Sequence, residues 1–233
     1  MTPVFLGAAY WSAVALELSA ARSRTWSQAR IAVPTVFVFT TLTLIATLLH
    51  LDLFHFGAEH PPATRAVTWA WLAIYTAVPV LMIIVTVRQH RSGVADLPRE
   101  RRLPGWIRLA LVVLVLVFGG VGLGLFLLPE ESASWWPWQL TPLTSRAVGA
   151  WLISLAVASG HSLIEDDVAR IRPLGATAVV FGVLQAVALL RYGGEVDWSS
   201  LPSIGYLAVL VTLLGLGVWA LRARQISSAR PRR

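Results

Sequence analysis

The stretch IRLALVVLVLVFGGVGLGLFLL at residues 107–128 decides the fold class, because its only charged residue is Arg108 near its start. A helix of this length extends for about 33 Å, which matches the ~30 Å hydrocarbon core of a bilayer. A surface helix of a soluble domain would keep a polar stripe along one side, and this stretch has none. We therefore expect it to cross a membrane.

Six further apolar runs of similar length predict additional spans. They lie at 4–21, 31–51, 67–87, 142–162, 173–191 and 204–221. Thr141 followed by Pro142 is typical of a helix start, with threonine as the N-cap and proline in the first turn. Only the run 4–21 contains an acidic residue, Glu17. The pattern predicts an all-α fold, a polytopic transmembrane bundle over 1–222 followed by a basic tail over 223–233.

A cluster of three tryptophans precedes the fifth span. Trp135, Trp136 and Trp138 fall within the segment SASWWPWQL at 132–140. Indole side chains favour the membrane–water interface, so we expect this segment to lie on the membrane surface.

Arginine distribution predicts the orientation of the spans. All 19 basic residues are arginine, and if the N-terminus lies outside, 16 of them fall on the cytoplasmic side. Only Arg65, Arg146 and Arg191 then lie outside. Positive charge favours the cytoplasmic side of membrane proteins, so the C-terminus is predicted to be cytoplasmic. The same rule accounts for the net charge of +7 without a nucleic-acid partner, which we do not expect.

Two missing residue types exclude several kinds of chemistry. The chain has no cysteine, which excludes disulfides, thiolate catalysis and cysteine-ligated metal centres. It also has no lysine, which excludes a retinal Schiff base and a Walker-type phosphate loop. No cofactor is expected from the sequence.

Three ionisable residues form the first candidate site. Glu17 lies late in the first span and His161 late in the fifth, so both are expected near the cytoplasmic surface. Glu165 follows His161 by four residues, which places the two on one helix face. We predict an inner polar cluster of Glu17, His161 and Glu165 that holds a proton or a buried ion pair. A simple helix end with a solvated Glu17 is the alternative. Four-residue spacing also predicts that Asp166 pairs with Arg170.

A second candidate site lies in the outer loop after the second span. Five residues with imidazole or carboxylate groups occur within eleven positions, and both groups are ligands for zinc or copper. They are His50, Asp52, His55, Glu59 and His60. Their spacing matches no fixed metal motif, so an ordinary polar loop is the alternative.

Glycines within the spans predict close helix packing. Gly120 and Gly124 have GxxxG spacing, and the last span carries Gly215 and Gly217. Small residues let membrane helices approach closely. We expect these spans to associate within the chain, with a partner membrane protein or with a second copy.

Two segments carry a resemblance to known sequences. LLHLDLFHF at 48–56 and WPWQLTPLTSRA at 136–147 resemble uncharacterised multi-pass membrane proteins of GC-rich bacteria. The resemblance implies a bacterial plasma-membrane protein. It implies no activity and no functional residue.

Three functions remain open from the sequence. The first is a non-catalytic subunit or scaffold, with the lipid bilayer as surroundings and a membrane protein as partner. The second is a small-solute transporter or channel, with a path near Pro79, Gln185 and the inner polar cluster. The third is a membrane enzyme with a metal site at the outer loop. A cavity reaching the middle of the membrane would favour the second, and convergence of the outer-loop histidines would favour the third.

Overall fold

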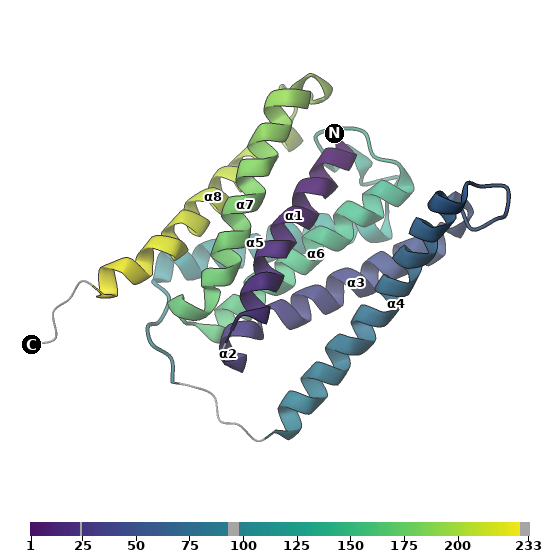
Figure 1. Ribbon diagram of the computed structural model, residues 1–233. Coiled ribbons are helices and arrows are strands. Elements are labelled where there is room, and N and C mark those ends of the chain that lie inside the picture. The colour runs from purple at the N-terminus through teal and green to yellow at the C-terminus, as the bar shows by residue number, and fades with distance from the viewer. Residues whose placement is uncertain (24, 93–97, 229–233) are drawn as a thin grey trace, which may run out of the picture.

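The computed structural model describes residues 1–23, 25–92 and 98–228, with side chains through residue 223 (Figure 1). Seven of its helices are long and apolar enough to cross a membrane, and the described residues contain no β-strand. The fold is the expected all-α bundle of a multi-pass membrane protein. The seven long helices are α1 (Thr2–Ala21), α3 (Ala32–Leu49), α4 (Pro62–Arg91), α5 (Gly105–Leu127), α6 (Pro142–Glu165), α7 (Val168–Tyr192) and α8 (Leu201–Ser228).

Four short helices lie in the connections. They are α2 (Trp26–Ala29), η1 (Leu51–Leu53), η2 (Ala133–Trp135) and η3 (Gly193–Glu195). The N-terminus and the last described turn of α8 lie at opposite ends of the bundle (Figure 1). We call the end that carries the α1–α3, α4–α5 and α6–α7 connections the arginine-rich end.

The helix α6 is the centre of the bundle. It packs against α5 and α3, while α1 packs against α7, α7 against α8, and α4 against α3. Within the spans, 56% of α6 is buried but only 11% of α4. The helix α4 therefore lies at the edge of the bundle and diverges from α3 toward the arginine-rich end (Figure 1).

Glycines let two pairs of helices approach closely. A Cβ at Gly149 of α6 would lie 2.7 Å from the carbonyl oxygen of Gly122 in α5, and one at Gly217 of α8 would lie 2.7 Å from that of Gly175 in α7. A Cβ at Gly120 would meet no atom within 4 Å. The packing role expected of the glycine-bearing spans thus appears inside the chain, but Gly120 and Gly215 take no part in it.

Most helix ends extend beyond the apolar runs that predicted them. The expected capping of α6 is present. The Thr141 side chain accepts a hydrogen bond from the Thr144 N–H, and the Thr144 side chain accepts one from the Thr141 N–H. The helix α7 begins five residues before the apolar run at 173, because Asp167 caps its first turn. The helix α8 continues through Ser228, so residues 223–228 of the expected tail are helical. Residues 229–233 lie outside the described chain.

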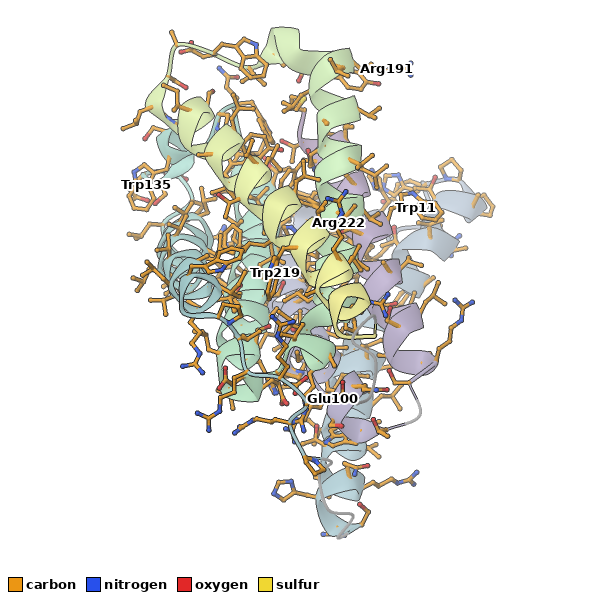
Figure 2. All side chains as sticks on the ribbon, turned by 90° about the vertical axis from the view of Figure 1, so that its left-hand side faces the viewer. Trp11, Glu100, Trp135, Arg191, Trp219 and Arg222 are labelled. Carbon is orange, nitrogen blue, oxygen red and sulfur yellow. The ribbon has the colours of Figure 1, made fainter. Side chains whose placement is uncertain are left out.

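The tryptophan segment differs from the expectation of a surface-lying stretch. Trp135 is 51% exposed at the flank of the bundle (Figure 2). Trp136 and Trp138 are instead buried and pack against Phe5 and Tyr206. Burial against other aromatic rings outweighs the interfacial preference of these two indoles.

Candidate functional site

The connection between α6 and α7 holds the most strongly paired charges of the described chain. The Glu165 carboxylate is 1% exposed and accepts from the Arg30 Nε and, at 2.8 Å, from the Arg30 Nη2. It also accepts from the Arg170 Nη1 at 2.7 Å, and the His161 Nε2 lies 3.1 Å away. Arg30 ends α2, whereas Arg170 belongs to the first turns of α7. One buried carboxylate therefore joins three separate elements.

The next residue, Asp166, joins this connection to the start of α5. Its backbone is left-handed, with φ at 44°, which ends α6. Its carboxylate accepts from the Arg108 Nη2 at 2.6 Å and from the Leu103 N–H at 3.1 Å. The sequence expectation that Asp166 pairs with Arg170 is wrong in this respect, because the turn after Glu165 directs the Asp166 side chain to Arg108.

Asp167 caps α7 and holds the segment before α5. It accepts from the backbone N–H groups of Ala169 and Arg170, and from those of Glu100 and Arg101. We call the three acids Glu165, Asp166 and Asp167 the carboxylate clamp. Glu100 marks its level at one end of the molecule, far from Arg191 at the other (Figure 2).

The electrostatic balance at Asp166 favours its ionised form. Partial burial acts to raise the pKa of this carboxyl. The hydrogen bonds from Arg108 and Leu103 and the charges of Arg108 and Arg102 outweigh that effect and hold the pKa below its usual range.

A separate cavity of about 340 Å³ lies among α1, α3, α4, α6 and α7. Aromatic rings form much of its wall. The hydroxyl groups of Tyr10 and Tyr75 lie 2.7 Å apart, and the Trp71 ring centroid lies 4.5 Å from that of Tyr75. Phe39 contacts both tyrosines edge-on. We call this space the aromatic cavity; Tyr10, Glu17, Phe39, Trp71, Tyr75 and Trp151 are among the residues that line it.

Glu17 brings a carboxylate to the aromatic cavity. It lies four residues before the end of α1, about 6 Å along the helix axis. Glu17 and Glu165 are the only acidic residues within the seven long helices. Glu17 forms no hydrogen bond or ion pair with any described residue, whereas Glu165 is enclosed by cations. The structure thus brings His161 and Glu165 together as expected but places Glu17 in the lining of another cavity.

The five candidate residues of the loop after α3 do not gather at one site: His50 contacts Arg146, His60 contacts both His55 and Glu59, and Asp52 stands apart. The His50 Nε2 lies 2.7 Å from the Arg146 Nη1, and the His55 and His60 rings stack edge-on with centroids 4.3 Å apart. Glu59 lies 3.4 Å from His60. Across the described chain, no three His, Asp or Glu side chains are arranged to hold a metal ion, and Asp52 joins none of these pairs.

Gln185, expected near a transport path, is used in packing. It is fully buried, its Nε2 donates to the Phe5 carbonyl at 3.1 Å, and its Oε1 accepts from the Tyr206 hydroxyl at 2.8 Å. Pro79 lies one helical turn after Tyr75. Because proline has no backbone N–H, the Tyr75 carbonyl lacks its usual hydrogen bond within the helix. Pro79 therefore loosens α4 at the level of the aromatic cavity.

Sequence reasoning missed Arg30, Arg108, Tyr10 and Tyr75 as members of these sites. One signal was present for Tyr10, which precedes Glu17 by seven residues and so shares its helix face. Comparisons with models of protein families, with curated proteins and with solved structures found no match for the chain.

Proposed function

We propose that the protein binds a small hydrophobic organic cation inside the membrane and acts as a transporter for such solutes. The observation that carries this proposal is Glu17, a carboxylate with no charge partner among the described residues, in the lining of the aromatic cavity. Ionisable groups are costly within a bilayer and tend to mark sites of function. A cation bound there would supply the missing opposite charge.

The aromatic wall suits the same ligand class. Cations are attracted to the faces of tryptophan and tyrosine rings, and the attraction is strongest where water is excluded. Trp71, Tyr75 and Tyr10 place three such rings around one cavity. Together with Glu17 they offer what a monovalent cation with an apolar body needs, namely one negative charge and several polarisable surfaces.

The position of α4 gives the solute a way in. This helix packs chiefly against α3 and contributes Trp71 and Tyr75 to the cavity wall. Pro79 interrupts its hydrogen-bond ladder one turn beyond Tyr75. A bend of α4 at Pro79 would widen the cavity between α1 and α4 without disturbing the packing around α6.

The arrangement supports this second sequence-based interpretation over the others. The subunit or scaffold interpretation remains a prediction, and the outer-loop residues do not converge as the metal-enzyme interpretation requires. We further propose that the arginine-rich end faces the cytoplasm of a bacterial cell, on the grounds of the 16-to-3 division of arginines.

Binding of tetraphenylphosphonium to the detergent-purified protein tests the proposal. A cation about 5 Å from the Glu17 carboxylate gains about 3 kcal/mol at an effective dielectric constant of about 20, or about a hundredfold in affinity. Because the Glu17 side chain is exposed, solvent screening reduces this gain, and we expect Glu17→Gln to weaken binding by about tenfold. Glu130→Gln, an exposed carboxylate at the opposite end, should leave the affinity unchanged.

Further measurements separate charge from ring contacts. Tyr75→Phe should retain most of the affinity and Tyr75→Leu should lose more, with melting temperatures confirming that both variants fold. The neutral analogue triphenylphosphine oxide should bind weakly to every variant. Wild-type affinity in Glu17→Gln, or equal binding of the neutral analogue, would refute the proposal. Uptake of the cation into proteoliposomes then tests transport itself.

A further inference from the structure

A second and larger cavity opens at the arginine-rich end, between α3 and α4. Its volume is about 640 Å³, and α2 and the end of α6 close it on the side of the bundle. We call it the basic cleft. Its lining includes Trp26, Arg30, Phe37, Met82, Thr86, His90, His161 and Glu165.

The lining of the basic cleft is divided by polarity. Phe37 of α3 and Met82 and Ile83 of α4 line the part that lies deeper in the bundle, and Val33 and Val87 continue that apolar surface. Arg30, His90 and His161 line the part nearest the arginine-rich end. The apolar part of the cleft would suit the acyl chains of a phospholipid, and the polar part would suit its headgroup.

Arginines outnumber carboxylates at the α6–α7 connection beside the cleft. Arg30 and Arg170 face the single Glu165 carboxylate, and Arg108 and Arg102 face Asp166. The Arg99 guanidinium donates hydrogen bonds to the backbone carbonyl oxygens of Glu165 and Ile164. Five guanidinium groups therefore surround the three carboxylates of the clamp.

Two basic residues that contact Glu165 also line the cleft itself. Arg30 and His161 are each 23% exposed there, although both contact Glu165. The last turn of α4 carries Arg88, His90 and Arg91, and of these His90 lines the cleft. A phosphate group seated in the cleft would lie against the Arg30 guanidinium of α2 and the imidazoles of His90 in α4 and His161 in α6.

The depth of these groups matches the headgroup level. Trp26 lines the cleft beside Arg30, and indole rings favour the membrane–water interface. His90 lies in the last turn of a 30-residue helix, longer than the ~20 residues needed to cross the hydrocarbon core. Basic pockets between membrane helices at this level are suited to lipid phosphate groups.

We propose that the basic cleft binds one anionic phospholipid, with its phosphate against Arg30, His90 and His161 and an acyl chain between α3 and α4. The proposal is independent of a cation in the aromatic cavity, since Glu17 lines the one cavity and not the other. A lipid seated there would also fill the space that divides α4 from the rest of the bundle at this end.

Lipid-dependent melting of the delipidated, detergent-purified protein tests this site. Phosphatidylglycerol should raise the apparent melting temperature, phosphatidylcholine should raise it far less, and inorganic phosphate alone should not. Native mass spectrometry should show one retained phosphatidylglycerol. An equal effect of phosphatidylcholine would overturn the role of charge, and an equal effect of inorganic phosphate would overturn the lipid as ligand.

Two variants locate the site without touching the carboxylate clamp. Thr86→Trp fills the cleft and His90→Ala removes a polar group from it, so each should weaken phosphatidylglycerol binding by about tenfold. Thr76→Trp makes the same change at a shallow groove to which only α4 contributes residues. Its binding of phosphatidylglycerol should equal that of the wild type. Wild-type binding in Thr86→Trp, or an equal loss in Thr76→Trp, would place the lipid elsewhere and refute the proposal.

Discussion

Replacing Glu165 with glutamine should destabilise the whole bundle, because this carboxylate is the buried centre of the clamp. Glutamine keeps the shape and one acceptor oxygen but removes the negative charge. The Arg170 guanidinium, only 7% exposed, would then lose its ion-pair partner of 2.7 Å. Arg30 would lose the same partner, although its 23% exposure gives it access to water.

The size of the effect follows from burial. Breaking a buried ion pair by removing one partner costs about 3–5 kcal/mol. The partial exposure of Arg30 and the remaining acceptor of glutamine favour the lower value, about 3 kcal/mol. For a chain of this size, a loss of about 3 kcal/mol lowers the melting temperature by about 6–12 °C.

Tryptophan fluorescence during heating of the purified protein measures this change. Glu131→Gln, an exposed carboxylate at the opposite end, is the matched control and should melt within about 1 °C of the wild type. In a double-mutant cycle with Arg170→Gln, the double variant should lose at least about 1 kcal/mol less than the sum of the single losses. A Glu165→Gln protein that melts like the control, or strictly additive losses, would refute the reasoning.

Two further predictions concern the clamp and the helix crossings. Since the pKa of Asp166 is held below its usual range, its ion pair with Arg108 stabilises the fold above the ordinary carboxyl pKa of about 3.9, and this contribution is lost as the pH falls through the lowered value. The melting temperatures of wild type and Asp166→Asn should therefore differ by a constant amount between about pH 7 and 5 and approach each other as the pH falls below the ordinary carboxyl pKa of about 3.9; a gap that does not narrow below that pH would contradict this. Gly149→Ala should cost about 1–3 kcal/mol in thermal unfolding, because its methyl group would meet backbone atoms of α5, whereas Gly120→Ala should be neutral; equal effects would contradict the crossing geometry.

The number of spans could be predicted from sequence because apolar length is a local property. Each helix needs only enough apolar residues in a row to match the bilayer. The ends were less predictable, because they depend on capping and on polar residues that continue a helix beyond the hydrocarbon. Asp167 illustrates this, since its side chain starts α7 five residues before the apolar run at 173.

The candidate site was predictable only where its members are near in sequence. His161 and Glu165 are four residues apart, and their contact follows from helix geometry. Arg30 and Glu165 are 135 residues apart, and no local pattern distinguishes Arg30 from the other arginines near span ends. Glu17 was expected beside His161 from its depth alone, but depth does not fix which face of a helix meets which neighbour.

Trp136 and Trp138 show the same limit in another form. Their residue type favours the membrane surface, yet both rings are buried against Phe5 and Tyr206. The partners lie on α1 and α8, at opposite ends of the chain. Such a contact depends on the completed bundle and could not be seen in the segment itself.

The carboxylate clamp also determines when, during synthesis of the chain, its earlier segments can be joined to its middle. Glu165 follows four complete spans along the chain, and its partner Arg30 precedes three of them. While the ribosome delivers α3, α4 and α5, the turn between α1 and α3 has no Glu165 with which to pair. The clamp closes only after the α6–α7 connection is made, and at that moment it ties the earliest and the middle segments of the chain together. The contacts that hold the N-terminal segments to the clamp can therefore form only after the three consecutive acids Glu165, Asp166 and Asp167 have been translated.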